Sequence, residues 1–420
     1  KKLYLKKLWE NIPQSNHLVL NKIITGTFRI GVSKGLITKA ISKFANIDES
    51  IISHRLMGEL KPTFENYIFL INKNYKTEEL KYKPYPFQLA KPFDKKVKAL
   101  STNNFNFEWK WDGIRSQIIK RSEQVSIWTR GEELVNNSFP ELVNTILNIE
   151  DDFVLDGEIL IWDHFKNLPK DFSFLQKRLG RIKPSLKMQK ELPLTFISYD
   201  LIEINGIDLR KQIQEKRRFI LENYFNKWEQ QNKNQFSTLL KITDLHALKD
   251  WEEVEKVKNL SRSHGTEGLV IKNKKSEYVA GRKSGHWWKY KVDPMQLDAV
   301  LIYAKGGSGK RAGLYTDYSF ALWDNDKLVK FANAYSGLSN TEIKELDKWI
   351  RKNTLERYGP VRSVKPEMVF EISFENIQLS KRHKSGIAVR FPRISKWRKD
   401  KVIKDADNIN NAYQLMNKVL

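Results

Sequence analysis

Apolar residues recur at intervals of three and four through the first 80 residues of the chain. The clearest example is LITKAISKFANI (36–47), and SIISHRLMGEL (50–60) keeps the same period after an acidic turn. This spacing places the apolar side chains on one face of a helix. KPYPFQLAKPFDKK (83–96) then holds three prolines, which indicate a linker into a new domain. We therefore expect residues 1–82 to form a helical segment.

A different pattern begins near residue 105, where short apolar runs alternate with turn residues. Such runs predict strands. They are FNFEWKWDGIRSQIIKR (105–121), QVSIWTRG (124–131), DFVLDGEILIWD (152–163), LPLTFISYDLIEING (192–206) and GTEGLVIKN (265–273). Helical patterns at 208–225 and 245–265 lie between them, so residues 83–292 should form a mixed α+β domain. Alternating strands over 293–420 favour a small β-barrel, which makes the expected fold a multidomain α+β protein.

The charge of the chain points to a polyanionic partner. Lys and Arg number 74 against 50 Asp and Glu, which gives a net charge of +24. Nucleic acid is the first candidate for a protein so basic. The alternative is a lysine-rich surface without a specific partner. An anionic membrane is less favoured, because no strongly basic amphipathic helix stands apart from the folded sequence.

Other features of the composition exclude whole classes of site. The chain has no cysteine, which rules out disulfides, thiolate zinc sites, iron–sulfur clusters and cysteine nucleophiles. No stretch approaches the roughly 18–20 apolar residues of a membrane span. The seven histidines show no paired or HExxH spacing, so we expect no zinc. Because KKLYLKKLWE at the start resembles the middle of a helix, we expect a fragment of a longer protein.

A series of short motifs carries the chemistry. EWKWDGIR (108–115) contains a Lys-x-Asp-Gly core, which alone is weak evidence, since a surface lysine before a type I turn is an alternative. Its weight comes from the motifs that follow in order. They are WTRGEE (128–133), VLDGEIL (154–160), FISYD (196–200), TEGLVIK (266–272), WWKYK (287–291) and RFPRISKWRKDK (390–401).

These motifs contain the residue types that a bound nucleotide requires. A lysine amine attacks phosphorus only in its neutral form, which neighbouring cations such as Lys289 and Lys291 favour. The same cations stabilise charge on the transferred phosphate. An aromatic ring can stack on the base. Carboxylates at strand ends can surround a hard divalent cation, and the candidates are Asp112, Glu158 and Glu267.

The order and spacing of the motifs strongly resemble the ATP-dependent DNA ligases, within the nucleotidyltransferase superfamily that also holds RNA ligases and capping enzymes. RFPR followed by RKDK is similar to DNA ligases rather than capping enzymes. GTFRIG (26–31) resembles the minor-groove-contacting turn in the helical DNA-binding domain of larger DNA ligases. HRLMGELKPT (54–63), followed by the proline-rich linker, is similar to a bacterial branch of that family. The resemblance implies a helical DNA-binding segment (1–82), an adenylyltransferase domain (83–292) and an OB-fold barrel (293–420).

The resemblance also implies a role for each site residue. Lys110 would be the nucleophile that becomes adenylylated, in a loop shaped by Asp112 and Gly113. Glu108 would recognise the adenine amino group, and Glu158 the ribose hydroxyls and a metal-bound water. Tyr199 would stack on the base, although a tyrosine before a turn can simply belong to the core, and Phe196 is a weaker candidate. Asp200 is expected to support the pocket.

The remaining contacts are expected from basic residues. The nucleotide, its phosphates and the 5′-phosphate of the nick would be held by Arg115, Arg130, Lys289, Lys291, Arg390, Arg398 and Lys401. Arg390 and Arg393 can alternatively be surface cations, and Asp400 would order the final loop. The metal ligands would be Glu267, Asp112 and Glu158. DNA would be contacted by Arg29, Lys305, Lys310 and Arg311. The last three belong to KGGSGKRAG (305–313), which lacks the first glycine and the Ser or Thr of a true phosphate-binding loop.

The expected activity is therefore the sealing of 5′-phosphate/3′-hydroxyl nicks in duplex DNA through a lysyl-AMP intermediate, in DNA repair. The cofactors would be ATP as AMP donor and Mg²⁺, with Mn²⁺ as a substitute. We expect a monomer that acts on nicked double-stranded DNA in the bacterial cytoplasm, associated with the nucleoid, and not on membranes. Two alternatives stay open at this point: an RNA ligase or RNA-capping enzyme, and a non-catalytic DNA-binding relative.

Overall fold

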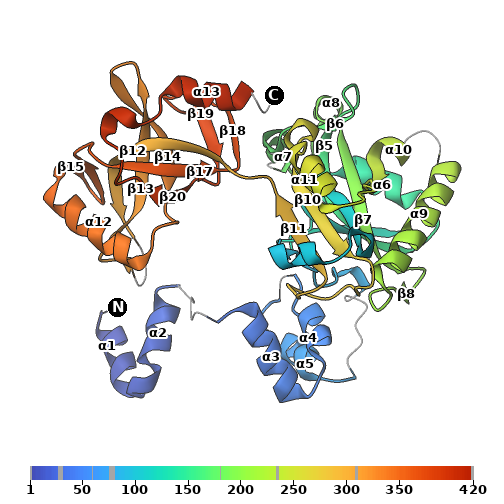
Figure 1. The fold of residues 1–420 in the computed structure, drawn as a ribbon. Coiled ribbons are helices and arrows are strands. Elements are labelled where there is room, and N and C mark those ends of the chain that lie inside the picture. Colours follow the sequence, from blue (N-terminus) through green and yellow to red (C-terminus); the bar gives the residue numbers. More distant parts are fainter. Residues whose placement is uncertain are drawn as a thin grey trace. The chain divides into compact units, whose positions relative to one another are not determined.

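The computed structural model of the chain describes residues 2–26, 32–58, 60–74, 81–179, 181–232, 236–307 and 311–417. The chain divides into two compact units (Figure 1). The first consists of Lys1–Glu253 and Leu269–Tyr290, and the second of Val254–Gly268 and Lys291–Leu420. The three-domain division expected from the sequence stays a prediction.

The first unit begins with short helices. They are α1 (Lys2–Asn11), α2 (His17–Ile24), α3 (Lys34–Ala45), α4 (Glu49–Arg55) and α5 (Phe64–Ile71). Side chains at the N-caps fix the start of the last three, because Ser33, Asp48 and Thr63 each accept a hydrogen bond from a backbone N–H of the first turn. The helical character expected for this part of the chain is confirmed in the residues described.

The centre of the first unit is a seven-stranded, largely antiparallel sheet in the order β4-β3-β5-β7-β8. The strands are β3 (Ile114–Arg121), β4 (Gln124–Thr129), β5 (Phe153–Asp163), β7 (Leu194–Ile204) and β8 (Ile207–Asp208), with β6 (Leu168–Pro169) beside β5 and β9 (Leu240–Ile242) parallel to β7. Helices follow the strands. They are α6 (Pro140–Leu147), α7 (Phe172–Leu179), α8 (Leu186–Glu191), α9 (Gln214–Gln231) and α10 (Phe236–Leu239). The helix α11 (Trp251–Asn259) begins in the first unit and ends in the second.

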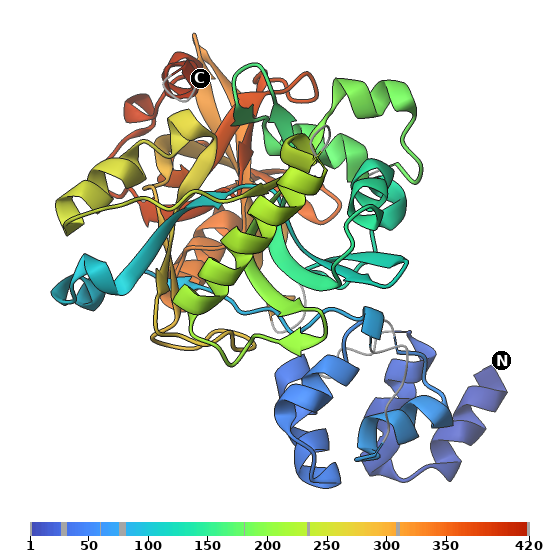
Figure 2. The same ribbon diagram turned by 90° about the vertical axis from the view of Figure 1, so that its right-hand side faces the viewer.

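One face of this sheet is covered by helices. The helix α9 runs across it next to β7 (Figures 1 and 2). Leu221 and Trp228 of α9 are fully buried in the same apolar cluster as Phe153 and Leu155 of β5. Because side chains alternate along a strand, the residues between them point to the opposite face. Asp156 and Glu158 therefore share the face that the helices leave uncovered.

A second sheet, in the order β1-β11-β10-β2, lies on that opposite side. Its strands are β1 (Lys91–Pro92), β2 (Phe105–Trp111), β10 (Thr266–Asn273) and β11 (Trp287–Lys291). Trp287 of β11 packs in one buried cluster with Ile119 of β3, Val154 of β5 and Ile202 of β7. The two sheets therefore pack face to face, and the polar residues of these inner faces form the candidate site.

The second unit contains an antiparallel barrel-like sheet. Its elements are β12 (Met295–Gly306), β13 (Tyr315–Asp324), β14 (Lys327–Ala334), α12 (Asn340–Lys352), β15 (Thr354–Tyr358), β16 (Val361–Val364), β17 (Val369–Phe374), β18 (Asn376–Leu379), β19 (Ile387–Arg390), β20 (Arg393–Trp397) and α13 (Ile409–Asn417). The long strand β12 pairs with β13, β16 and β17, so it organises the sheet. This arrangement confirms the expected OB-like barrel.

The boundaries of two predicted helices differ from the structure. The helix predicted at 208–225 begins only at Gln214, because Ile207 and Asp208 form strand β8. The helix predicted at 245–265 is reduced to Trp251–Asn259, since the chain then turns through Gly265, which has a φ of 64°. Arg29 and Lys310 lie outside the described residues. Within the described parts of the chain, no helix is both long and apolar enough to cross a bilayer.

Candidate active site

Lys110 lies next to the tight turn that joins β2 to β3. Gly113 in this turn packs directly on β5: a Cβ atom there would lie 2.3 Å from the Ile159 carbonyl oxygen and 2.9 Å from Glu158 Cγ. The Gly113 N–H also donates a hydrogen bond to Glu158 Oε1 at 3.2 Å. The absence of a side chain at residue 113 thus lets the turn that follows Lys110 rest against the sheet.

Glu158 is the electrostatic centre of this group. It lies opposite Arg115 in the pairing of β5 with β3. Burial raises the pKa of the Glu158 carboxyl to about 7, against the opposing influence of the Lys110 and Arg115 charges, while Asp112 raises it further. The structure therefore brings together four of the residues predicted from the motifs, Lys110, Asp112, Arg115 and Glu158.

Glu108, two residues before Lys110 on β2, forms a buried ion pair. Its Oε2 lies 2.8 Å from Lys272 Nζ, and the two side chains are only 2% and 1% exposed. Burial raises the pKa of Glu108 and lowers the pKa of Lys272. The other carboxylate oxygen, Oε1, has no hydrogen-bond partner among the described residues. A buried acceptor without a donor is costly, so Oε1 is suited to accept a hydrogen bond from a ligand.

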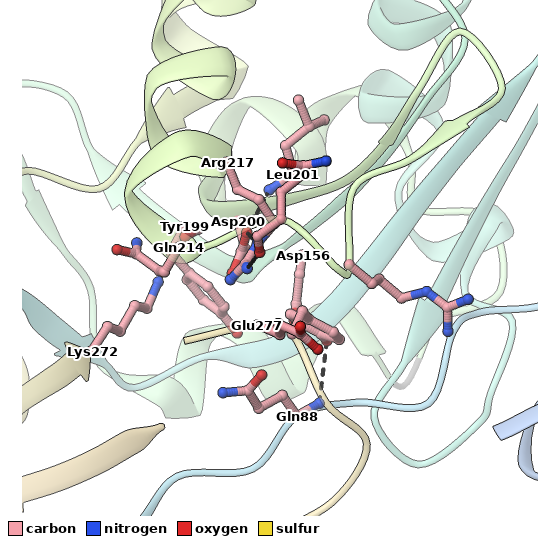
Figure 3. Close-up of polar contacts among 12 residues, drawn as sticks. Gln88, Asp156, Tyr199, Asp200, Leu201, Gln214, Arg217, Lys272 and Glu277 are labelled. Atoms are coloured by element: carbon pink, nitrogen blue, oxygen red, sulfur yellow. Dashed lines mark hydrogen bonds and ion pairs between the residues drawn. The ribbon is translucent and has the colours of Figure 1, made fainter. Parts of the chain in front are cut away.

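Aromatic and cationic side chains surround this pair. Lys272 Nζ donates to the Tyr199 carbonyl oxygen at 2.7 Å and lies 4.9 Å from the centre of the Tyr199 ring and 4.5 Å from that of Trp287. Figure 3 shows Lys272 and Tyr199 in this cluster. Tyr199 is partly exposed, whereas Phe196 is fully buried in the core under the helices. Of the two aromatic candidates, only Tyr199 is therefore accessible to a base.

Arg115 is held in a fixed position by Asp156, a residue that was not among the predicted site residues. Its Nε and Nη2 donate to Asp156 Oδ1 and Oδ2 at 3.1 and 2.7 Å. Burial lowers the pKa of the guanidinium, but the adjacent Asp156 charge outweighs this and leaves the pKa raised. The backbone N–H of Arg130 donates to the Arg115 carbonyl oxygen at 2.9 Å, while the Arg130 side chain is exposed.

Asp200 is buried under the site. It forms a bidentate ion pair with Arg217 of α9, with both distances 2.8 Å (Figure 3). This supports the expectation that Asp200 stabilises the pocket rather than contacts a ligand. Lys289 lies on β11, where its carbonyl oxygen accepts a hydrogen bond from the Phe93 N–H at 3.0 Å.

Two further motif residues, at the start of β10 and at the end of β11, belong to the parts of these strands that fall in the second unit. Lys291 Nζ lies 3.1 Å from Glu267 Oε2 and 3.6 Å from Glu375 Oε2. Glu375 also pairs with Arg393 at 2.9 Å, so Arg393 is more than an isolated surface cation. Glu375 lies outside all the motifs, and no sequence signal marked it.

The final motif is organised by Asp298 of β12. Arg398 Nη1 lies 2.9 Å from Asp298 Oδ2, and Lys401 Nζ donates to the same oxygen at 2.6 Å. Asp400 pairs with Arg398 at 2.7 Å, which agrees with its expected role in ordering this loop. The Arg390 guanidinium lies over the Phe391 ring at 4.9 Å.

The geometry supports the predicted metal site and the predicted DNA contacts less strongly than the predicted nucleotide pocket. Among the described residues, no three His, Asp or Glu side chains gather as a metal site. Asp112 and Glu158 influence each other in the first unit, but Glu267 belongs to the second, so the three-carboxylate site stays a prediction. Lys305 and Arg311 are exposed on the barrel, and Arg311 donates to Asn340 at 2.9 Å.

Two residues that contact predicted members of the candidate site were not themselves predicted, although both lie inside the quoted motifs. Lys272 ends TEGLVIK, and Asp156 lies inside VLDGEIL. The alternation of side chains along β5 places Asp156 on the same face as Glu158, which was a usable signal. Tyr278 and Gln88, by contrast, lie in loops that no pattern connects to the site.

The comparisons with known proteins agree with this geometry. Two family models match the chain, the ATP dependent DNA ligase domain over residues 87–291 and the ATP dependent DNA ligase C terminal region over residues 311–401. A probable DNA ligase of Koribacter versatilis is 33% identical over 422 residues, covering 96% of this chain and 72% of that protein. A DNA ligase of Methanocaldococcus jannaschii is 29% identical, covering 94% of this chain and 71% of that protein. A solved structure of Lig E DNA ligases has a TM-score of 0.50 at 17% identity, covering 75% of this chain and 100% of that chain, a likeness of fold alone.

Proposed function

Because the chain belongs to the family of ATP-dependent DNA ligases, we propose that it seals 5′-phosphate/3′-hydroxyl nicks in duplex DNA through a lysyl-AMP intermediate on Lys110. The observation that carries the assignment of residues is the arrangement on β2. Glu108, a buried carboxylate with an open acceptor, lies two residues before Lys110. The charge of Lys110 in turn lowers the pKa of the Glu158 carboxyl, against the effect of burial. One strand thus presents groups for the base and for the phosphate of the same nucleotide.

The adenine of ATP fits the polar atoms of the pocket. Its amino group is a hydrogen-bond donor, and Glu108 Oε1 is a buried acceptor without a partner among the described residues. Lys272 holds Oε2 and keeps the carboxylate oriented. Tyr199 would stack on the base. The phosphates would be contacted by Arg115, Arg130, Lys289 and Lys291. Guanine has an acceptor in place of the amino group and would leave Oε1 facing another acceptor.

The reaction proceeds in three displacements. Lys110 Nζ attacks the α-phosphorus of ATP, which forms the phosphoramidate bond and releases pyrophosphate. The nick's 5′-phosphate then attacks the AMP phosphorus, and Lys110 leaves as the amine. The 3′-hydroxyl finally displaces AMP and forms the phosphodiester bond. Arg390, Arg398 and Lys401 are proposed to orient pyrophosphate in the first step.

Asp112, Glu158 and Glu267 are the carboxylates proposed to hold a divalent cation. Mg²⁺, or Mn²⁺ in its place, would neutralise charge on the phosphate oxygens when bound. Carboxylate oxygens are the ligands that such a hard cation prefers. The raised pKa of Glu158 fits this role, since a nearby cation would favour its ionised form.

We assign the nucleic-acid contacts to the basic surface. A net charge of +24 and the exposed side chains of Lys305 and Arg311 support binding to duplex phosphates. Residues 1–82 are proposed to add DNA contacts, with Arg29 among them. We further propose a monomer that acts in DNA repair in the bacterial cytoplasm.

The test is intact mass spectrometry after incubation with ATP and Mg²⁺, for the wild type and for Lys110→Ala. Pyrophosphate treatment first removes any AMP already attached. We expect an AMP adduct on the wild type alone, together with sealing of a nicked duplex that carries a 5′-phosphate. A matched duplex with a nicked RNA strand shows whether RNA is the preferred substrate. No adduct on the pretreated wild type would refute the proposal.

A further inference from the structure

We propose that Tyr278 is a positioning residue for Arg115, acting through Asp156, and that Gln117 couples this arrangement to the segment 85–88. The inference rests on the proposed function, in which Arg115 contacts the nucleotide or the nick's 5′-phosphate. Tyr278 lies between TEGLVIK (266–272) and WWKYK (287–291) and has no role in the proposed chemistry.

Asp156 is the group that connects Tyr278 to Arg115. This side chain is fully buried, and both of its oxygens accept hydrogen bonds from Arg115. Its Oδ2 accepts a further hydrogen bond from the Tyr278 hydroxyl at 2.6 Å. A bidentate pair fixes the plane of a guanidinium, so the orientation of Arg115 depends on the orientation of the Asp156 carboxylate. Tyr278 is the second group that restrains this carboxylate.

Tyr278 is itself restrained by hydrogen bonds to its hydroxyl. Its side chain is 4% exposed, and its hydroxyl accepts hydrogen bonds from the Gln88 N–H at 3.2 Å and from Gln117 Nε2 at 3.4 Å. The dashed line at Gln88 in Figure 3 marks the first of these bonds, close to Asp156. Burial keeps the pKa of the Tyr278 phenol well above its ordinary value. The hydroxyl therefore stays protonated and donates a hydrogen bond to Asp156.

Gln117 connects the Asp156 and Tyr278 network to the segment 85–88, through which the chain enters the domain. Gln117 lies opposite Asp156 in the pairing of β3 with β5 and is fully buried. Its side-chain amide binds both backbone groups of Tyr85, accepting from the N–H at 2.8 Å and donating to the carbonyl oxygen at 3.0 Å. The Tyr85 hydroxyl in turn donates to Glu203 at 2.6 Å. The segment 85–88 is thus bonded to the polar layer that orients Arg115.

The Arg115 guanidinium has aromatic neighbours that make its position consequential. It lies 5.2 Å from the ring centre of Phe87, within the segment 85–88, and 5.6 Å from that of Tyr199. A shift of Asp156 would therefore move Arg115 relative to the aromatic residue proposed to stack on adenine. Small displacements of a group that orients a substrate have large effects on rate.

The test is a double-mutant cycle that combines Tyr278→Phe with Arg115→Lys. Tyr278→Phe keeps the ring and removes only the donor to Asp156, whereas Arg115→Lys keeps the charge and removes the bidentate geometry. The assay is single-turnover sealing of a nicked duplex by pre-adenylylated protein. A second assay gives the maximal rate of lysyl-AMP formation and the ATP concentration at which that rate is half-maximal. Tyr318→Phe is the control, because it removes a buried hydroxyl that binds the Tyr315 carbonyl oxygen in the barrel.

We expect Tyr278→Phe to slow at least one of the two half-reactions about tenfold. Its melting temperature should fall no more than that of Tyr318→Phe, which should keep wild-type rates. In the Arg115→Lys background, Tyr278→Phe should cost little more, because the two changes remove one arrangement. Full additivity of the two losses would overturn the proposal.

Two measurements keep the inference separate from the function on which it rests. Wild-type protein that forms no AMP adduct would refute the proposed function. Wild-type protein that forms the adduct and seals the nick, with Tyr278→Phe equal to Tyr318→Phe in both half-reactions, would refute the inference alone. If Arg115→Lys fails to fold, this comparison of the two tyrosine variants still decides the matter.

Discussion

Gly113→Ala should damage catalysis far more than an exchange of one hydrogen for a methyl group normally does. The added Cβ would lie 2.3 Å from the Ile159 carbonyl oxygen, 2.7 Å from Leu160 Cδ2 and 2.9 Å from Glu158 Cγ. An ordinary contact of this kind begins near 3.4 Å. The turn and β5 must therefore separate by about 1 Å, the difference between 3.4 and 2.3 Å, because a backbone oxygen cannot rotate away.

This separation predicts both a stability effect and a rate effect. Overpacking of a well-packed site costs about 1–3 kcal/mol of unfolding free energy. The larger consequence is the displacement of Lys110, three residues before the alanine, relative to Glu158. A misplacement of about 1 Å in a reacting group can cost roughly 100-fold in rate. The hydrogen bond from the residue 113 N–H to Glu158 would also lengthen from 3.2 Å.

The assay is the rate of lysyl-AMP formation, measured alongside chemical denaturation. Gly131→Ala is the matched control, since its Cβ would meet only Thr129 Oγ1 at an ordinary 3.5 Å. We expect the control to keep the wild-type rate and Gly113→Ala to lose about two orders of magnitude. A Gly113→Ala protein that is adenylylated at the wild-type rate would show that the close approach of the turn to β5 is unimportant for Lys110.

Predictions for three other residues follow from charged groups in the first unit. Burial raises the pKa of Glu158 from 4.5 to about 7, so its contribution to stability is largest below pH about 4.5 and falls as pH rises to about 7, by at most about 3 kcal/mol. Lysyl-AMP formation should instead rise with pH as this carboxylate ionises, and a pH profile that Glu158→Gln leaves unchanged would argue against Glu158 as a required anion. Glu108→Gln replaces the charged acceptor, so it should raise the ATP concentration needed for half-maximal lysyl-AMP formation roughly 10-fold or more. An unchanged ATP requirement would argue against base recognition by Glu108. Asp200→Asn should cost about 3–5 kcal/mol in denaturant titrations, since it leaves Arg217 buried without its counter-charge, whereas the more exposed Asp208→Asn should cost about 0–1 kcal/mol. Equal losses would contradict that argument.

The strands could be predicted because they depend on local patterns. The runs around Lys110, Glu158 and Tyr199 combine alternation with turn residues, and each is a strand in the structure. Helix boundaries were predicted less well. The start of α9 is set by β8, a two-residue strand that exists only through its pairing with β7. Such an element has no sequence period of its own.

The members of the site were predictable where one motif supplied them. Lys110 and Glu108 share a strand, and the pairing of Arg115 with Glu158 follows from two neighbouring strands. The partners of these residues were harder to predict because they depend on tertiary packing. Asp298, for example, lies 100 residues before Arg398, and nothing in a single sequence connects them.

The partners that the sequence did not reveal explain how the cations of the candidate site are held in place. Arg115 is paired with Asp156, Lys272 with Glu108, and Arg398 with Asp298. An unpaired cation in a buried pocket would be strongly destabilising, so each requires a carboxylate that is equally buried. The pairing also fixes the direction in which the remaining N–H groups point, which is the requirement for recognising a phosphate. Exposed basic residues outside these pairs, such as Lys305 and Arg311, contribute to the net charge of +24 and can attract the phosphates of DNA.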